Sequence, residues 1–147
     1  PAHPDAPEVV GLDIAPGAVE GAGRFPRRPN LRFEQGDFLA LPERFHGAFD
    51  WLWEHTLFCA IDPEDRPRYA RSVACAVRPG GLFLAIFYLN PDHDDAGPPH
   101  GVSPDELDAR FSSAFDLVRQ WRPARSYPGR EGRELLRLHR RRPTTPA

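Results

Sequence analysis

Two acidic positions in the first third of the chain could hold an adenosine. Asp13 ends a short apolar run, residues 8–13, and its carboxylate can accept two hydrogen bonds from a ribose diol. Asp37 and Phe38 follow the next run, where Asp37 could accept from an exocyclic adenine amine and Phe38 could cover a ring face. A helix cap at Asp13 and a plain turn residue at Asp37 are the alternatives. Together the two positions favour an adenosine lying across neighbouring strand ends.

Glu54 and His55 follow another apolar run, residues 48–53, and begin the polar stretch 54–63. In open α/β sheets ligands bind at the carboxyl ends of the strands, so this stretch is the strongest indication of a ligand. A histidine there could orient a cofactor carboxylate, bind an anionic substrate when protonated, or take a proton from a nucleophile. A structural histidine at the rim of the sheet is the alternative.

Metal and disulfide chemistry are not favoured. The irregular loop 90–102 offers only His93 and His100 as nitrogen ligands, and its prolines constrain them without making them converge, so we predict no metal. Cys59 and Cys75 lie in apolar surroundings without metal-ligand spacing, which predicts two buried, reduced thiols. The chain contains no Ser-His-Asp constellation and no Gly-rich phosphate loop.

Composition limits the partners and the location. The arginine-rich region 119–142 could bind nucleic acid, but no aromatic residues alternate with its arginines, and the net charge is −2. We therefore expect solvated strand faces and no nucleic-acid partner. No run approaches the ~20 apolar residues that span a bilayer, and no signal pattern opens the chain, so we expect a cytoplasmic monomer without a membrane partner. Because the chain opens on Pro1 and contains no methionine, we also expect its natural N-terminus to be missing.

Hydrophobic periodicity predicts the elements that position these residues. Strands are expected at 8–13, 31–35 (a half-exposed edge), 48–53 (buried), 82–88 (covered on both faces), 115–121 and 133–140. Helices are expected from Pro16 to about 22, from about 67 to the Pro-Gly-Gly at 79–81 after a short turn capped by Asp62, and from a capping box at 103–106. This order favours a single α/β domain over residues 1–147, largely parallel, with an antiparallel strand at its end.

These motifs resemble the thiopurine S-methyltransferase family of class I S-adenosylmethionine-dependent enzymes. That family also includes halide, thiocyanate and thiol methyltransferases and enzymes that act on selenium or tellurium compounds. The similarity covers nearly the whole chain, and its most specific residues are the segment 54–63, Arg66, the Pro-Gly-Gly at 79–81, and Gly97-Pro98-Pro99 followed by Val102. The resemblance implies a Rossmann-like class I methyltransferase sheet, S-adenosylmethionine as cofactor, and a small-molecule methyl acceptor.

The resemblance also implies roles for single residues. Asp13 matches the acidic residue on the ribose hydroxyls, Asp37 and Phe38 the pair around the adenine, and His55 a position between cofactor and acceptor. Ile14 and Glu54 are the further cofactor-binding positions. His55 is the catalytic candidate, and Pro98 and Pro99 match the wall of the acceptor pocket. The implied reaction is direct in-line transfer to a small soft nucleophile without a covalent enzyme intermediate. Alignment of donor and acceptor can supply ~7–11 kcal/mol of the barrier.

One departure from the family keeps alternatives open. The family's first strand and Gly-rich turn should precede Pro1, and in the family's sheet that strand lies between the strands predicted at 8–13 and 48–53. Without it, we expect residues 1–147 alone to be marginally stable and to bind S-adenosylmethionine poorly. A non-catalytic methyltransferase-like fragment is one alternative. Another is a different adenine-nucleotide-binding α/β protein that uses Asp13 on NAD, although the Gly-Pro-Pro loop argues against it. These residues do not identify the acceptor.

Overall fold

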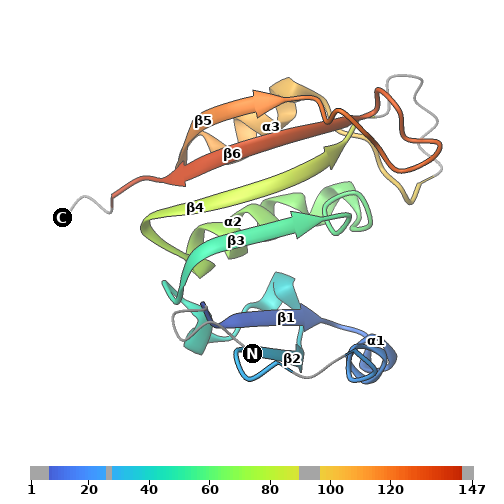
Figure 1. Cartoon of the computed structure of the whole chain (residues 1–147). Helices are drawn as coiled ribbons and strands as arrows, with labels where there is room; N and C mark the ends of the chain where they lie inside the picture. The colour runs from blue at the N-terminus through green and yellow to red at the C-terminus, as the bar shows by residue number, and fades with distance from the viewer. Residues whose placement is uncertain (1–6, 26–27, 90–96, 144–147) are drawn as a thin grey trace. The chain divides into compact units, whose positions relative to one another are not determined.

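The computed structural model of the protein describes residues 7–25, 28–89 and 97–143, and the chain divides into two compact units, Pro1–Pro42 and Glu43–Ala147 (Figure 1). Each unit has its own sheet. That all 147 residues form one methyltransferase-like domain stays a prediction.

The first unit is a small β-α-β arrangement. Strand β1 (Val9–Asp13) and strand β2 (Leu31–Gln35) pair in parallel, with helix α1 (Pro16–Ala22) between them in sequence. Pro16 opens the helix because a first-turn residue needs no amide hydrogen. The parallel register brings Asp13 opposite Gln35, so both strands end at the same edge. All three elements were predicted from the sequence.

The second unit carries a four-stranded mixed sheet in the order β3-β4-β6-β5 (Figure 1). Its strands and helices are β3 (Phe49–His55), α2 (Arg66–Ala76), β4 (Val77–Tyr88), α3 (Pro104–Phe111), β5 (Phe115–Trp121) and β6 (Glu134–Arg141). Strand β3 is parallel to β4, whereas β6 is antiparallel to both β4 and β5. The carboxyl ends of β3 and β4 therefore lie together, with His55 opposite Ile86.

Local signals explain where the two long helices begin and end. The hydroxyl of Ser103 accepts a 3.1 Å hydrogen bond from the amide of Glu106, as the predicted capping box requires. A short 3₁₀ turn, η3 (Pro63–Asp65), precedes α2 as expected, but the Asp62 side chain makes no capping hydrogen bond. Helix α2 ends at Ala76, and the Pro-Gly-Gly that was predicted to end it lies inside β4. There the register with β3 shifts, and Gly80 takes a φ of 79° that favours glycine.

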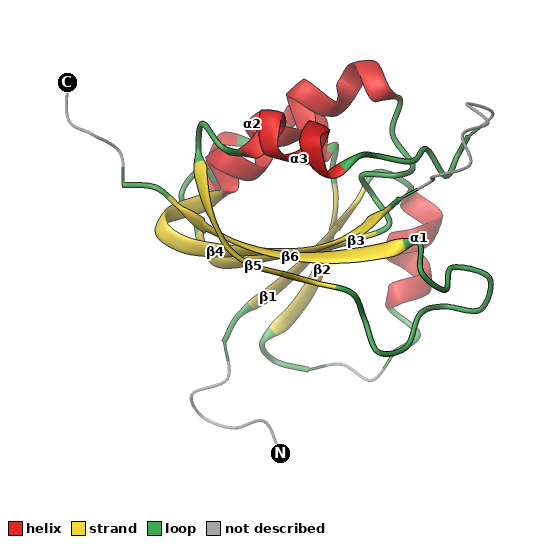
Figure 2. Cartoon of the chain, turned by 90° about the horizontal axis from the view of Figure 1, so that it is seen from above, coloured by secondary structure: helices red, strands yellow, loops and turns green. Residues whose placement is uncertain are grey.

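Helices α2 and α3 cover one face of the four-stranded sheet (Figure 2). Phe83 and Phe87 of β4 point to this face and are fully buried. They pack edge-on or tilted against each other and against Phe58, Phe111 and Phe115, with ring centroids 5.3 to 6.3 Å apart. This aromatic cluster is the core of the second unit.

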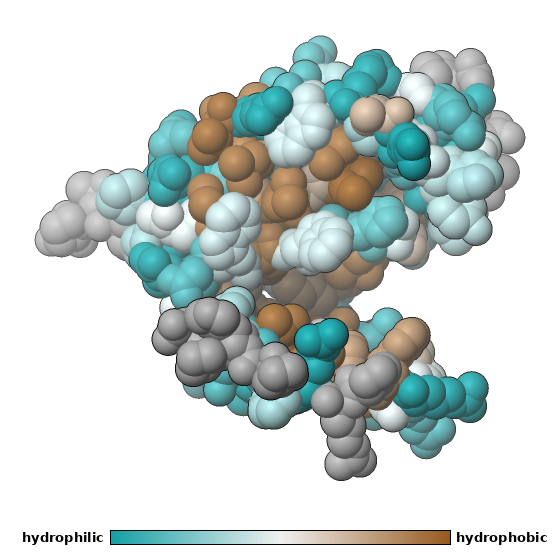
Figure 3. Space-filling view, viewed as in Figure 1, coloured by the Kyte–Doolittle hydropathy of each residue, from teal (hydrophilic) through white to brown (hydrophobic). Residues whose placement is uncertain are grey.

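The opposite face of the same sheet is only partly covered. Leu82, Leu84 and Ile86 alternate with the buried residues of β4 and are half-buried, while Trp51 and Trp53 are 57% and 73% exposed. Apolar surface extends over the middle of this sheet in Figure 3. The predictions of a buried strand at 48–53 and of complete cover at 82–88 were therefore wrong. The physical reason is that β3 is the last strand of its sheet and the described helices of this unit cover one face.

Among the described residues, no helix has both the length and the apolar character needed to cross a membrane.

Candidate functional site

Asp13 lies at the carboxyl edge of the first unit and uses one oxygen locally. Its Oδ1 accepts a 2.8 Å hydrogen bond from the amide of Ala15, just before helix α1. Because Ala15 precedes the helix and α1 has no side-chain capping hydrogen bond, Asp13 does not cap α1, and the alternative of a helix cap was wrong. Asp13 and Ile14 are nevertheless exposed, Ile14 to 65%, so a carboxylate oxygen and an apolar side chain face outward at this strand end.

Asp37 follows β2 at the same edge of the first unit. The amide of Gly36 donates a 2.9 Å hydrogen bond to the carbonyl of Asp13, which joins the two strand ends. Asp37 Oδ1 accepts from the amide of Leu39 at 2.8 Å and caps the 3₁₀ turn η1 (Phe38–Ala40). The structure therefore brings the four predicted adenosine residues of this unit, Asp13, Ile14, Asp37 and Phe38, to one sheet edge.

Glu54 is the buried anchor of the turn that follows β3. Its Oε1 accepts hydrogen bonds from the amides of Leu57 at 2.7 Å and Phe58 at 2.9 Å. Burial raises the pKa of Glu54 to about 7, although both amide bonds act in the opposite direction. Its Oε2 is buried without a hydrogen-bond partner among the described residues. Whether Glu54 also contacts a cofactor stays a prediction.

The turn of residues 56–61 is fixed by the buried side chain of Phe58, and it follows directly after the exposed His55. Phe58 is 1% exposed and packs edge-on against Tyr69 and Phe87, with centroids 5.1 and 5.3 Å away. Thr56 has a φ of 73°, an uncommon value for a residue with a β-branched side chain, so the chain reverses sharply directly after β3. His55 is exposed at this strand end.

The Gly-Pro-Pro loop is joined to the same turn. The amide of His100 donates a 2.7 Å hydrogen bond to the carbonyl of Cys59, and the amide of Val102 donates to the carbonyl of Tyr88 at 3.1 Å. Pro98 and Pro99 are exposed beside this joint. The structure thus brings the acceptor-side predictions, His55 with Pro98 and Pro99, to the carboxyl end of the second unit's sheet.

The buried side chain of Arg66 anchors the loop 97–102 by hydrogen bonds to its backbone, a role that the sequence did not reveal. Its side chain is 3% exposed and bonds to both carboxylate oxygens of Glu106, at 3.0 and 3.2 Å. The other guanidinium nitrogen donates to the carbonyl of Gly101 at 3.0 Å and more weakly to that of His100 at 3.4 Å. The available signal was an arginine placed before the proline that opens α2.

The two cysteines differ from each other. Cys59 is buried, and its thiol lies 3.4 Å from the carbonyl of Thr56. Cys75 is exposed, so the prediction that both thiols are buried was wrong for Cys75, which lies on the outer side of α2; neither forms a disulfide. Within the described parts of the chain no group of three or more His, Cys, Asp or Glu could hold a metal. His93 lies outside the described residues.

The C-terminal arginines bond mainly within the unit. Arg141 donates to the carbonyls of Ala74 and Ala114, Arg142 pairs with Asp116 at 2.8 Å, and Arg140 donates to the carbonyl of Gly80. These contacts stabilise the second unit, so the arginines at 140–142 have a structural role.

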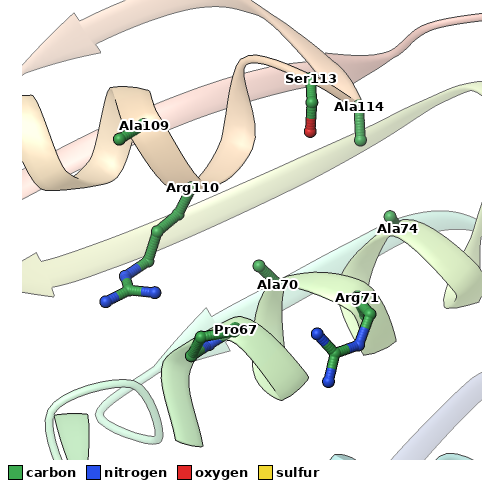
Figure 4. A pocket seen from close by; sticks show the side chains of 8 residues that line it. All are labelled: Pro67, Ala70, Arg71, Ala74, Ala109, Arg110, Ser113 and Ala114. Atoms are coloured by element: carbon green, nitrogen blue, oxygen red, sulfur yellow. The ribbon is translucent and has the colours of Figure 1, made fainter. Parts of the chain in front are cut away.

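A shallow groove of about 280 Å³ runs between α2 and α3 (Figure 4). Alanine methyls dominate its lining, and the Arg110 at its rim is already paired with Glu106 at 2.7 Å. None of the predicted site residues lines it.

Comparison with known proteins identifies the family to which this chain belongs. A sequence model described as thiopurine S-methyltransferase matches residues 4–126. Thiocyanate methyltransferase 1 of Brassica oleracea is 34% identical over 133 residues, which are 87% of this chain and 58% of that protein. A probable thiol methyltransferase 2 of Arabidopsis thaliana is 34% identical over 73% of this chain and 47% of its own length. The chain thus spans about half the length of the curated relatives that it matches.

Solved structures show the same fold. An S-adenosylmethionine-dependent methyltransferase of Methanosarcina mazei superimposes with a TM-score of 0.73 over 92% of this chain and 82% of its own, at 15% identity. An N1-methyltransferase of Burkholderia thailandensis with bound S-adenosylhomocysteine gives 0.68 over 92% of this chain and 62% of its own, at 18% identity. The chain therefore belongs to the thiopurine S-methyltransferase family of S-adenosylmethionine-dependent methyltransferases.

Proposed function

We propose that this chain acts in methyl transfer from S-adenosylmethionine to a small soft nucleophile, that is, a thiol, halide, thiocyanate or chalcogen species. The observation that carries the proposal is the joint between the turn 56–61 and the loop 97–102, made by the His100 amide and the Cys59 carbonyl. The joint ties the turn that follows β3 to the Gly-Pro-Pro loop, at a strand end of the kind where ligands of α/β sheets bind. This arrangement supports a role for His55, Pro98 and Pro99 in binding the acceptor. The thiocyanate and thiol methyltransferases among the relatives support the acceptor class.

The residues at the edge of the first unit suit the nucleoside half of the cofactor. Asp13 and Asp37 each use Oδ1 in one local hydrogen bond, which leaves Oδ2 for a ribose hydroxyl or an adenine amine. Exposed Ile14 and half-buried Phe38 offer apolar surface beside them. Bound at this edge, the cofactor would supply an electrophilic methyl group on a sulfonium.

The residues of the second unit would orient the acceptor. His55 is exposed at the end of β3 and can bind an anion when protonated or take a proton when neutral. Glu54 fixes the turn beside it, and Pro98 and Pro99 form a rigid wall. Such positioning can supply most of the acceleration of a direct transfer.

The cofactor part is tested by calorimetric titration of S-adenosylhomocysteine into the protein as its gene encodes it. Asp13→Ala should weaken binding by about 1–3 kcal/mol, whereas Glu20→Ala, an exposed acidic residue on α1, should not. Equal affinities of the wild type and Asp13→Ala would reject the ribose role. Preferential binding of NAD would favour a different nucleotide-binding protein.

The acceptor part is tested with a panel of thiols, halides, thiocyanate and selenide. His55→Ala should lower turnover more than it lowers cofactor affinity, while exposed His46→Ala serves as the matched control. If the wild type binds the cofactor but methylates no member of the panel, the activity proposal fails and the binding proposal stands.

A further inference from the structure

Strand β2 has an open edge in the first unit. Among the described strands its sole neighbour is β1, so one row of its backbone donors and acceptors has no strand beside it. The carbonyl of Asn30 and the amide of Gly36, which flank β2, both bond to β1, at 2.7 and 2.9 Å. Because backbone groups alternate in direction along a strand, those of Leu31, Phe33 and Gln35 point to the open edge.

The side chains of this strand carry opposite charges that are placed symmetrically about Phe33. Arg32 and Glu34 lie one residue to either side of it, and their side chains pair with each other at 2.8 Å on one face of the strand. If a second copy of β2 lies antiparallel with its Phe33 opposite this Phe33, each Arg32 faces the Glu34 of the other copy. These two positions are non-hydrogen-bonded pairs, in which opposing side chains come closest.

The same charges exclude other pairings. A shift of the symmetry axis by one residue sets Arg32 opposite Arg32, or Glu34 opposite Glu34, and like charges that face each other directly are destabilising. The other edge of this sheet, along β1, offers no such complement, because the charged residues at its ends, Glu8 and Asp13, are both acidic. Charges on an edge strand usually prevent pairing with foreign strands. Here their arrangement favours one partner, a second copy of the same strand.

Packing in the first unit also favours a larger sheet. Phe33 is 40% exposed, and its ring lies where a Cβ on Gly11 would be, so it covers the sheet face above β1. Opposite a second Phe33 it would gain an aromatic cross-strand neighbour. The unit has two strands and a helix that buries none of its residues, whereas three or more strands are usual for a stable sheet. Pairing of two copies through β2 would give four.

We infer that the open edge of β2 (Leu31–Gln35) is a self-recognition surface, at which two copies of this chain pair antiparallel about Phe33 into one four-stranded sheet. This pairing does not depend on the proposed function, and it departs from the expectation of a monomer. Five residues on each side are far fewer than the roughly 20–30 of a standard interface. We therefore expect a weak, reversible dimer with a dissociation constant of about 0.1 to 1 mM.

The test is sedimentation equilibrium of the protein as its gene encodes it, between about 10 μM and 1 mM. The wild type should form dimers that high salt weakens. Glu34→Arg and Arg32→Glu should each raise the dissociation constant about 10- to 100-fold, because like charges then face each other. An equimolar mixture of these two variants should associate at least as tightly as the wild type, since a basic edge then meets an acidic one. Glu20→Arg, the same charge change on exposed α1, is the matched control and should dimerise like the wild type.

Hydrogen exchange of single amides gives a second readout that needs no variant. The amides of Phe33 and Gln35 should exchange more slowly at high protein concentration, because they point to the open edge. A wild type that stays monomeric at about 1 mM, with exchange independent of concentration, would overturn the inference. Association that neither charge reversal weakens would also overturn it, because another surface would then carry the contact. If both single variants lose association and melting temperature while their mixture does not associate, the Arg32–Glu34 pair acts only within one chain, and the inference fails.

Discussion

The backbone amide of His100 and the backbone carbonyl of Cys59 are joined by a 2.7 Å hydrogen bond across 41 residues of chain. Because both partners are main-chain atoms, the bond depends on the path of each segment and not on the identity of either side chain. Glu54 fixes the path of the first segment and Arg66 that of the second. The two buried charged residues are therefore expected to act on acceptor geometry from a distance.

Gly97 should not tolerate a side chain. A Cβ added there would clash with the imidazole of His100, so the ring or the loop must move. Gly97→Ala should cost about 1–3 kcal/mol of stability and lower turnover without weakening S-adenosylhomocysteine binding. Urea denaturation and calorimetry measure the two effects. Gly17→Ala is the control, because a Cβ there meets no atom within 4 Å and alanine favours the helix. A Gly97→Ala protein as stable and as active as the Gly17→Ala protein would contradict the prediction.

Arg66 should matter more than its exposed neighbour. Arg66→Ala leaves two carbonyls of the loop without their donor and removes one partner of Glu106, so we expect a loss of about 3–5 kcal/mol in the free energy of unfolding. Arg66→Lys should recover only part, because an ammonium cannot reproduce the forked contact. Arg68→Ala breaks an exposed pair with Asp65 and should cost at most about 1 kcal/mol. Chemical denaturation decides between these values, and similar losses for Arg66→Ala and Arg68→Ala would refute the assigned role.

Glu54 and His139 should make opposite contributions to stability as pH changes. Burial raises the pKa of Glu54 to about 7, so its contribution falls as pH rises from about 4.5 to 7. Burial lowers the pKa of His139 to about 4, with the charge of Arg137 acting in the same direction, so its contribution rises with pH between about 4 and 6.5. Each contribution amounts to about 3 kcal/mol, and between about pH 4.5 and 6.5 the two should nearly cancel.

Single substitutions separate these two contributions. Relative to the wild type, Glu54→Gln should gain stability with rising pH between about 4.5 and 7, because the falling contribution of Glu54 is then absent. His139→Phe keeps a ring against Phe83, whose centroid is 5.8 Å from that of His139, and should lose stability with rising pH over about 4 to 6.5. Denaturation at five or six pH values measures both differences. A difference curve without pH dependence for either variant would show that its group does not titrate as described.

The sequence predicted the elements better than their burial. Hydrophobic periodicity located β1, α1, β2, α3 and β5 because each carries a local signal, such as the Ser103 cap or the alternation of residues 31–35. Periodicity could not show that Trp51 and Trp53 are exposed, because an apolar run has the same pattern in a central strand and in the last strand of a sheet. Likewise the Pro-Gly-Gly at 79–81 ends helices in general, whereas here the helix ends three residues earlier and β4 continues through it.

Parts of the candidate site were accessible from the sequence and others were not. Asp13 and His55 end strands and Asp37 follows one, so position alone predicted their sheet edges. Arg66 acts through contacts with Gly101 and Glu106, which are 35 and 40 positions away in the sequence, and no local pattern predicts such contacts. Long-range pairing of this kind is decided by the packed fold.

The unequal strand counts of the two sheets have a consequence for amide hydrogen exchange. Strands β4 and β6 have a hydrogen-bonded neighbour on both sides, so their amides should exchange slowest and should report the global unfolding of the second unit. The first unit has two strands and a helix that buries none of its residues, which is too little for strong protection. Its amides should exchange within a short labelling time. Since Asp13 and Asp37 lie in this weakly protected unit, a nucleoside that binds them should slow exchange there selectively, so that mass spectrometry can detect cofactor binding in the absence of any acceptor.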